Sequence, residues 1–523
     1  MRTVRDVSRE LLRQLGLTTI FGNPGTTEIP FLIDWPSDFR YVLGLQESAV
    51  VAMADGYAQA TRRPVLVNLH SAGGVGHGLG HVFTAYRNRT PMIVLAGQQV
   101  RSLLPDDPFL GALDAASFPR PYVKWSIEPA RAQDVPAALS RAFHMATQAP
   151  HGPVFVSVPA DDWDAPGEPF PARPAMGGLA PDPDALAGLV AALTASSAPA
   201  LVVGAGVDGD GAVPEVVELA RRLKAGVWAA PMSSRCSFPE DDPLFQGFLN
   251  PERGAVARSL AGHDVVVVVG APAFTYHVYR GEPDVELPPL YVLSDDEQVL
   301  ARMPRGTGVR ATAKLVLRQL LDAVSPADRQ PPAPRATPPR PAAATPVSAA
   351  YVFATLAELL PSDALVVEET PSHRLAMQAH LPITATDTGF LTIASGTLGY
   401  GLPAAVGAAL GRPDRKVVAV LGDGSSMYGI QALWTAAREH LPVTFVVLDN
   451  TQYAAVRILG GEDKLPGVEL GGLDFTALAT GMGCAARRAE SPEELTAALT
   501  AALADDRPTV VHVTVDPDPQ KLY

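Results

Sequence analysis

Cysteine is nearly absent from this chain, which has two in 523 residues, Cys236 and Cys484. They lie far apart in sequence, so we expect no disulfide and a reducing compartment, the cytoplasm. Long apolar runs are also absent, because segments such as 265–269 have the length of a strand and are far too short to cross a bilayer. The first residues lack the apolar core of a signal peptide. We therefore expect a protein that has no membrane partner.

Positive charge is scarce relative to negative charge. The chain has 41 Lys and Arg against 55 Asp and Glu, a formal net charge of −14, and its basic residues are scattered. This balance argues against nucleic acid or an anionic membrane surface as a partner. Apolar residues, in contrast, make up 47% of the chain and charged residues only 18%, which is typical of a globular protein with large buried cores.

Two proline-rich stretches, 164–183 and 325–347, divide the chain into segments 1–163, 184–324 and 348–523. Proline at this density is incompatible with helix interiors and central strands, so both stretches are predicted to be extended linkers. Within each segment, short β-branched runs alternate with helical patterns. Continuous apolar strands between helices are typical of parallel sheets covered on both faces. We therefore predict α/β architecture with three doubly wound parallel-sheet domains.

The most informative motif is Gly422-Asp423-Gly424, which directly follows the apolar run 417–421. Glycines let the backbone turn tightly and approach a ligand closely. Asn450 ends the next apolar strand, so it and Asp423 would lie at neighbouring strand ends. Two oxygen ligands in that position suit a hard divalent ion that also holds phosphate oxygens. For the glycine motif alone, a coincidental turn in an α/β domain is the alternative.

The motif and its spacing resemble the signature of thiamine-diphosphate enzymes. In that family the Asp, the Asn and a backbone carbonyl two residues further on, here that of Gln452, bind Mg²⁺ (or Ca²⁺), which grips the cofactor diphosphate. The three segments then correspond to a pyrimidine-binding, a central and a diphosphate-binding domain. The resemblance assigns further cofactor contacts to Ser372, Gly396, Leu398, Gly422, Gly424, Ser425 and Tyr453.

Glu47 lies where a strand pattern ends and the apolar helical stretch 48–60 begins. Taken alone, it is an ordinary carboxylate at a helix N-terminus. In the family a glutamate at this place hydrogen-bonds the pyrimidine ring and favours its imino tautomer, so the resemblance implies that Glu47 activates the cofactor. It also implies that the Gly396 carbonyl accepts from the pyrimidine amino group and that Leu398 supports the bend between the rings. Core packing would explain Leu398 equally well.

Motifs along nearly the whole chain resemble the benzoylformate decarboxylase branch. They are Phe21 to Thr26, Leu45-Gln46-Glu47, Asn68 to Gly73, Pro119 to Ser126, Gly270 to His277 and Ala432 to Ala437. The implied reaction is non-oxidative decarboxylation of a 2-keto acid to an aldehyde and CO₂. The resemblance assigns Thr26 to the substrate carboxylate, and His70 and His277 to proton transfer, which suits a side chain that titrates near neutrality. For either histidine alone, a structural role is the simpler interpretation.

Three departures from the branch pattern concern the pocket and the cofactor site. Thr392 and Leu459 stand at positions that are aromatic in the branch, so selection for a phenyl group is expected to weaken. Pro371 interrupts a hydroxyl-rich run and leaves Ser372 to reach the phosphate. Asp449 stands before the metal-binding Asn, where an uncharged residue is common. We expect decarboxylase chemistry to persist and leave the acyl group open.

Other functions and features remain open from the residues alone. A carboligase similar to acetolactate synthase would use the same cofactor. An FAD- or NAD-dependent oxidoreductase would use 204–209, which fits G-x-G-x-x-G after an apolar strand. A non-catalytic, cofactor-binding relic is a further alternative. His77 and His81 are four residues apart, but no third metal ligand lies nearby, so a helix or interface position is favoured. Trp434 is expected in the core.

The resemblance also implies how the chain assembles. In the family, the glutamate and the diphosphate site that act on one cofactor come from different subunits. We therefore expect a homodimer as the smallest active unit and a homotetramer as the full assembly, with a small-molecule 2-keto acid as substrate.

Overall fold

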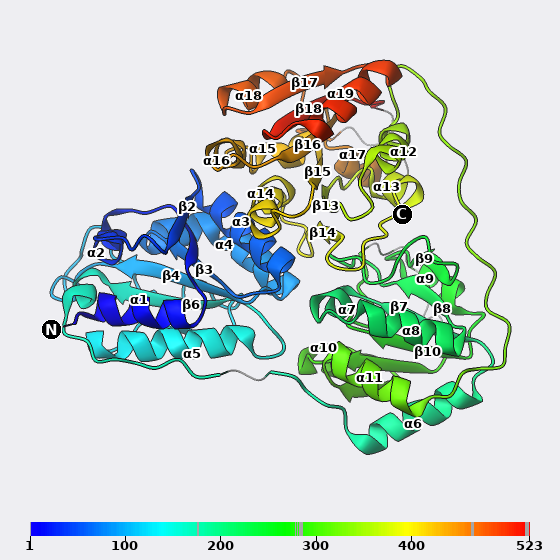
Figure 1. Cartoon of the computed structure of the whole chain (residues 1–523), viewed down its shortest axis with the longest axis horizontal. Helices are drawn as coiled ribbons and strands as arrows, with labels where there is room; N and C mark the ends of the chain where they lie inside the picture. The colour runs from blue at the N-terminus through cyan, green and yellow to red at the C-terminus, as the bar shows by residue number, and fades with distance from the viewer. Residues whose placement is uncertain are drawn as a thin grey trace.

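The computed structural model describes residues 2–174, 177–277, 279, 281, 286–461, 465–517 and 522. Within these residues the chain forms three six-stranded sheets, and neighbouring strands are parallel throughout. Helices cover both faces of the sheets (Figure 1). The predicted α/β architecture of three doubly wound parallel sheets is therefore confirmed.

The first sheet has the strand order β2-β1-β3-β4-β6-β5. Its strands are β1 (Thr19–Gly22), β2 (Arg40–Leu43), β3 (Val65–Leu69), β4 (Met92–Gln98), β5 (Ser126–Ile127) and β6 (Val154–Pro159). The helices around it are α1 (Val4–Gln14), α2 (Ile29–Leu32), α3 (Glu47–Thr61), α4 (Ser71–Asn88) and α5 (Val135–Thr147), with the short 3-10 helices η1 (Thr26–Glu28), η2 (Ala132–Asp134) and η3 (Ala160–Asp164).

The second sheet has the order β12-β11-β10-β7-β8-β9. Its strands are β7 (Pro199–Val203), β8 (Gly226–Ala229), β9 (Phe245–Phe248), β10 (Val265–Val269), β11 (Leu290–Ser294) and β12 (Thr307–Arg310), and its helices are α6 (Pro183–Ala195), α7 (Ala205–Gly209), α8 (Val213–Leu223), α9 (Arg253–Leu260), α10 (Glu297–Arg302) and α11 (Ala313–Ala323). The five valines of β10 are all buried, because separate apolar clusters cover the two faces of this sheet.

The third sheet has the order β14-β13-β15-β16-β18-β17. Its strands are β13 (Leu365–Glu369), β14 (Phe390–Thr392), β15 (Val417–Gly422), β16 (Val443–Asp449), β17 (Ala485–Ala489) and β18 (Thr509–Thr514). Its helices are α12 (Ala349–Leu359), α13 (Arg374–His380), α14 (Gly401–Gly411), α15 (Asp423–Met427), α16 (Ala432–Arg438), α17 (Ala454–Gly460), α18 (Phe475–Gly481) and α19 (Pro492–Ala504).

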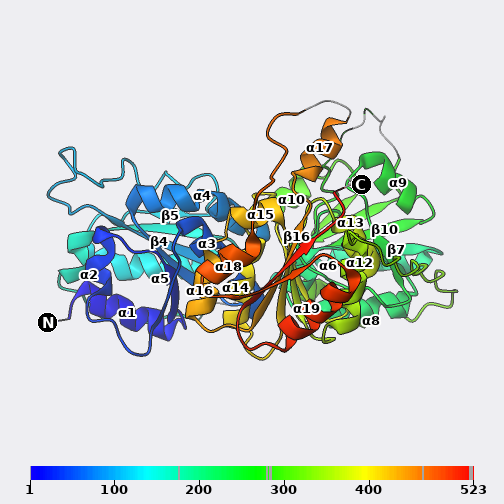
Figure 2. The ribbon, with the colours of Figure 1, turned by 90° about the horizontal axis from the view of Figure 1, so that it is seen from above.

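Helices α3 and α14 join the first and third domains into one apolar core. Glycines bring their backbones together, since a Cβ added at Gly56 would overlap the backbone of Ala404 and one at Gly407 would overlap the carbonyl oxygen of Met53. Side chains larger than hydrogen would force the helices apart. The two views agree that α3 and α14 lie side by side (Figures 1 and 2). This contact ties the N-terminus of α3 to the third domain.

A buried ionic junction ties the central domain to the other two. Arg62, which directly follows α3, donates to the carboxylate of Asp208 at 2.9 Å and to that of Asp387 at 2.6 Å. Arg235 of the central domain donates to the other oxygen of Asp208 at 2.7 Å and to the hydroxyl of Thr388 at 3.0 Å. Three domains therefore meet at one carboxylate, and losing either arginine would leave a buried charge undercompensated.

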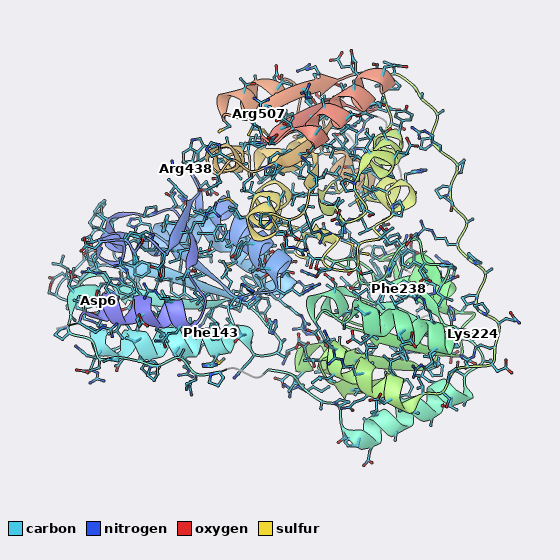
Figure 3. All side chains as sticks on the ribbon, viewed as in Figure 1. Asp6, Phe143, Lys224, Phe238, Arg438 and Arg507 are labelled. Atoms are coloured by element: carbon cyan, nitrogen blue, oxygen red, sulfur yellow. The ribbon has the colours of Figure 1, made fainter. Side chains whose placement is uncertain are left out.

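The long proline-rich stretch 325–347 runs along one side of the chain between α11 and α12 (Figure 1). Charged side chains stand on the outer surface, where Arg438 and Arg507 are exposed, while Phe238 lies inside the central domain (Figure 3). Trp434 is only partly buried, and the Arg438 guanidinium lies 5.3 Å from its ring centre. In the part of the chain that the structure describes, every helix is too short or too polar to span a membrane.

Candidate active site

The loops that follow β13, β15 and β16 meet at one edge of the third sheet. These strands are neighbours and parallel, so their carboxyl ends lie together. The loops carry Ser372, the motif Gly422-Asp423-Gly424 and Asn450. The topology therefore brings together the residues that the sequence analysis assigns to the diphosphate and the metal.

Asp423 opens α15 and is buried. One of its carboxylate oxygens accepts the N–H of Gly424 at 2.7 Å, but the other has no hydrogen-bond partner among the described residues. Burial, reinforced by the neighbouring Asp449 carboxylate, raises the pKa of Asp423 to about 7. A buried carboxylate oxygen without a partner is costly, and a bound cation would satisfy it.

Asn450 and Gln452 supply the other two expected oxygens. The side-chain carbonyl of buried Asn450 accepts the backbone N–H of Gln452 at 3.3 Å. The Gln452 side chain is engaged by Arg457, which donates to it at 2.7 Å, and by the carbonyl of Pro517. Oxygen donors of this kind suit Mg²⁺ or Ca²⁺. The described residues hold no cluster of three His, Cys, Asp or Glu that could bind a metal. Asp423, Asn450 and Gln452 are not such a cluster, since only Asp423 has a carboxylate.

Two buried histidines beside these ligands escaped the sequence analysis. The Nε2 atom of His373 lies 3.4 Å from the amide nitrogen of Asn450, and its Nδ1 atom is buried without a partner in the described part of the chain. Burial lowers the pKa of His373 to about 4, so the ring is neutral at pH 7. His512 Nε2 lies 2.8 Å from Asp449, the charged residue that departs from the branch pattern. Only strand topology brings these residues together, and no local spacing signals them.

The other assigned cofactor residues of this edge are tightly packed. A Cβ added at Gly424 would lie 2.5 Å from the ring of Tyr453 and 3.0 Å from Leu470, so the ring requires glycine there. Ser425 is buried in the first turn of α15, the helix that begins directly after Gly422. Ser372 is partly buried.

The segment that carries Gly396 and Leu398 lies against α4. Ser395 and Thr84 share a hydrogen bond of 2.9 Å between their hydroxyls. Gly396 has a φ of +78° and is exposed, and Leu398 is partly buried. Glu369, at the end of β13, accepts the N–H groups of Gly399 at 2.7 Å and Gly401 at 2.6 Å, and burial raises its pKa to about 8. This glutamate, which the sequence analysis missed, anchors the segment.

Glu47 is the first residue of α3, and its carboxylate lies 3.0 Å from Nδ1 of His77. His77 is therefore a neighbour of Glu47 on the next helix. A Cβ added at Gly74 would lie 3.4 Å from a carboxylate oxygen of Glu47 and 3.3 Å from the Cβ of His70. Glu47 and His70 thus flank the same glycine, and a small residue there keeps the space between them open.

His70 contacts two residues that were not singled out from sequence. Its Nδ1 atom lies 2.9 Å from the Glu28 carboxylate and 3.0 Å from the Thr27 hydroxyl. Thr26, the residue assigned to the substrate carboxylate, is exposed at the start of η1. His277 lies on an exposed loop of the central domain, where its backbone N–H donates to the Pro251 carbonyl at 3.0 Å.

Leu459 and Thr392, which replace aromatic residues of the branch pattern, lie in different environments. Leu459 is exposed on α17. Thr392 is buried, donates to Glu368 at 2.8 Å and accepts from Arg374 at 2.5 Å, so it is committed inside the third domain. Among the described residues, the polar contacts of Glu47 and His70 lie in the first domain, whereas those of Asp423 and Asn450 lie in the third.

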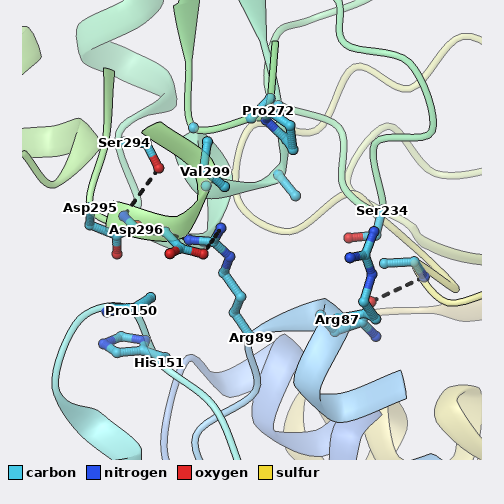
Figure 4. A pocket seen from close by; sticks show the side chains of 18 of the residues that line it. Arg87, Arg89, Pro150, His151, Ser234, Pro272, Ser294, Asp295, Asp296 and Val299 are labelled. Carbon is cyan, nitrogen blue, oxygen red and sulfur yellow. Dashed lines mark hydrogen bonds and ion pairs between the residues drawn. The ribbon is translucent and has the colours of Figure 1, made fainter. Parts of the chain in front are cut away.

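A cavity of about 890 Å³ lies between the three domains beside the 204–209 turn. Arg89 extends into it and pairs with Asp295 at 2.9 Å and Asp296 at 2.8 Å (Figure 4). The N–H groups of Gly204 and Gly206 donate to backbone carbonyls at 2.9 and 3.0 Å, so they are not directed at a phosphate. A Cβ at either glycine would collide with the 270–271 loop. Loop packing therefore explains Gly204 and Gly206, whereas a Cβ added at Gly209 would meet nothing within 4 Å.

Comparison with known proteins identifies the family. The models of thiamine pyrophosphate enzymes match along the chain: the N-terminal TPP binding domain at 2–118, the central domain at 186–320 and the C-terminal TPP binding domain at 370–513. Benzoylformate decarboxylase of Pseudomonas aeruginosa is 44% identical, over 99% of this chain and 100% of that protein. The structure of benzoylformate decarboxylase from Polynucleobacter necessarius superimposes with a TM-score of 0.97 at 39% identity, covering 99% of this chain and 100% of that one. The thiamine diphosphate-dependent 4-hydroxybenzoylformate decarboxylase of Rhodococcus jostii gives a TM-score of 0.94 at 40% identity, with 99% of each chain covered. This chain belongs to the thiamine-diphosphate-dependent enzyme family.

Proposed function

We propose that this chain is a lyase that uses thiamine diphosphate to decarboxylate a 2-keto acid of the benzoylformate class, releasing an aldehyde and CO₂. The observation that carries the proposal is the 44% identity with a benzoylformate decarboxylase over the full length of both chains. The match covers 99% of this chain, so it includes the segments that carry Glu47, His70 and Asp423, and the proposal concerns the site as well as the fold.

We propose that a divalent cation, Mg²⁺ or Ca²⁺, binds at the edge of the third sheet. Its ligands would be the partnerless oxygen of Asp423, the side-chain oxygen of Asn450 and the backbone carbonyl of Gln452. The buried, unpaired oxygen of Asp423 supports this assignment. His373 supports a diphosphate beside the cation, because a neutral ring that accepts from the Asn450 amide at Nε2 keeps a proton on Nδ1 for an anionic oxygen.

The residues of the chain would bind the substrate, position the cofactor and transfer protons around it. When bound, thiamine diphosphate supplies the carbon nucleophile and the electron sink for CO₂ loss. Glu47 would exchange a proton with the pyrimidine ring. Thr26 would hold the substrate carboxylate through its hydroxyl, and His70 and His277 would transfer protons at the reacting oxygen and carbon. Gly396 and Leu398 would position the two rings of the cofactor.

We propose that the active unit is a homodimer, assembled further into a tetramer. Large apolar side chains are exposed near both halves of the site, including Leu45, Phe109 and Leu113 in the first domain and Tyr428 and Leu459 in the third. The loop between β4 and β5 and helix α17 project on the same side of the chain (Figure 2). Such a surface favours burial against a second copy, which would complete the site.

The loop between β4 and β5 carries an aromatic residue, Phe109, whose surface is 86% exposed. Its loop is well fixed, because Gln99 donates to the Phe109 carbonyl at 3.0 Å and Ser71 donates to the Leu110 carbonyl at 2.7 Å. Ser71 directly follows His70. A fixed loop that carries an aromatic side chain and is tied to the residue after His70 supports an aryl substituent on the substrate.

The test is a substrate screen on the purified protein with added thiamine diphosphate and Mg²⁺. Aromatic, branched and linear 2-keto acids are offered, and CO₂ and aldehyde are measured together. We expect equimolar CO₂ and aldehyde, with benzoylformate among the best substrates. A second arm adds an acceptor aldehyde. If hydroxyketone formation consumed most of the keto acid, a carboligase would replace this proposal, and no CO₂ from any acid would contradict both.

A further inference from the structure

Glu28 is a buried carboxylate beside His70 that no motif identified. It ends η1, and its surface is 1% exposed. One oxygen accepts the N–H of Gly97 at 2.8 Å and the hydroxyl of Thr27 at 2.7 Å. The other accepts the N–H of Gly25 at 2.9 Å and lies 2.9 Å from His70 Nδ1. Four polar neighbours therefore converge on one buried side chain.

The direction of these hydrogen bonds determines the histidine tautomer. Backbone N–H groups can only donate, and the Thr27 hydroxyl gives its proton to the first oxygen of Glu28. A carboxylate with three donors already directed at it behaves as an acceptor, so the fourth neighbour, His70 Nδ1, donates as well. Thr27 Oγ1 lies 3.0 Å from the same nitrogen and can accept part of that proton. The proton of a neutral His70 is therefore on Nδ1.

Two glycines allow this arrangement. A Cβ added at Gly25 would overlap the His70 ring, and one added at Gly97 would overlap a Glu28 oxygen and lie 2.6 Å from the Thr27 hydroxyl oxygen. The backbone thus encloses the carboxylate and one edge of the ring. The opposite edge carries Nε2, and the His70 side chain keeps 23% of its surface exposed.

We propose that Glu28 is a positioning residue for the decarboxylation: it holds His70 with Nδ1 protonated and Nε2 presented, unprotonated, to the substrate. This inference rests on the proposed function and adds to it the residue that sets which ring nitrogen takes part. Partners of this kind fix the orientation and tautomer of a working histidine in other enzyme sites. Thr27 contacts both Glu28 and His70 and so belongs to the same arrangement, whereas Thr26 has the separate proposed role of binding the substrate carboxylate.

The first test is a double-mutant cycle of Glu28→Gln and His70→Gln. In Glu28→Gln an NH₂ group replaces one oxygen and meets a backbone N–H in either orientation, that of Gly97 or that of Gly25, so the side chain no longer holds His70 in one tautomer. We expect kcat to fall at least about tenfold with little change in KM, as for loss of a residue that orients a histidine. Because Glu28 acts through His70, the double variant is expected to be no slower than His70→Gln alone.

Each outcome separates this inference from the proposed function. Losses that multiply in the double variant, or a fully active Glu28→Gln, would overturn the positioning role while leaving the decarboxylase proposal intact. A fully active His70→Gln would instead contradict the use of His70 itself. Melting temperatures of the variants report whether the fold survives.

A measurement on the unmodified protein covers the case in which Glu28→Gln does not fold. Uniform ¹⁵N labelling of histidine gives separate signals for protonated and unprotonated ring nitrogens, and a His70→Gln sample identifies the His70 pair. We expect that, while the ring carries a single proton, Nδ1 is protonated and Nε2 is unprotonated. The reverse tautomer would overturn the inference.

Discussion

Gly407→Ala is the substitution for which the structure gives the clearest magnitude. The added methyl group would overlap the carbonyl oxygen of Met53 and lie 2.7 Å from its carbonyl carbon and 2.8 Å from the backbone nitrogen of Tyr57. All three are backbone atoms of α3, so no side chain can move to make room. Overpacking costs about 1–3 kcal/mol, and here the upper end applies. For domains of this size that corresponds to a melting temperature lower by roughly 6–12 °C.

The same change should reach the active site. Helix α3 begins at Glu47, and α14 begins just after the Leu398 segment. A displacement of about 1 Å between the helices would therefore lower kcat, since misplacement on this scale can cost about 100-fold. Gly188→Ala is the matched control, because a Cβ on that helical glycine meets nothing within 4 Å. Differential scanning calorimetry and steady-state kinetics compare the two. Equal melting temperatures for both variants would refute the close-packing argument.

Three further predictions address catalysis, pH and specificity. Glu47→Gln keeps the side-chain size and should fold normally, but kcat should fall by about 100- to 10,000-fold because the proton exchange is lost; full turnover would contradict the role of Glu47. Burial of His81 lowers its pKa to about 4, so the unfolded chain binds a proton that the folded chain excludes as the pH falls below about 6.5. Stability is therefore greatest above that pH and should be about 2 kcal/mol lower at pH 5. His81→Gln should flatten the melting temperature between pH 7.5 and 5, and an unchanged slope would reject this cause. Phe109→Ala should raise KM for aromatic keto acids several-fold more than for branched ones, and an equal effect on both would mean that the ring does not contact the acyl group.

The domain architecture could be predicted from sequence because it follows from local patterns. Continuous apolar strands separated by helices dictate parallel sheets, and Gly422-Asp423-Gly424 after such a strand places the carboxylate at the sheet edge. Asp423 lies there, with an unsatisfied oxygen that no sequence pattern states. The sequence pattern predicts where Asp423 lies, and the structure shows which of its two oxygens lacks a partner among the described residues.

Contacts between distant residues could not be predicted. Glu28 and His70 are separated by two strands in the chain, and they meet because β1 and β3 are neighbours in the sheet. His373 meets Asn450 in the third domain because β13 and β16, the strands that precede them, lie on either side of β15 and run parallel to it. The segment 204–209 shows the opposite case, in which a sequence motif suggests a binding site that the structure does not support. Its glycines fit a dinucleotide motif, yet Gly204 and Gly206 serve loop packing, because backbone crowding and ligand approach both require glycine.

Hybrid dimers test the central claim, that Glu47 of one copy and Asp423 of another act on one cofactor. Glu47→Gln and Asp423→Asn chains are prepared separately, each with little activity, and then mixed under conditions that exchange subunits, with hybrid formation followed by native mass spectrometry. Half of randomly mixed dimers are hybrids, and each hybrid has one intact site, so activity should return to about a quarter of the unmodified level. Verified hybrids without any recovered activity would contradict the account.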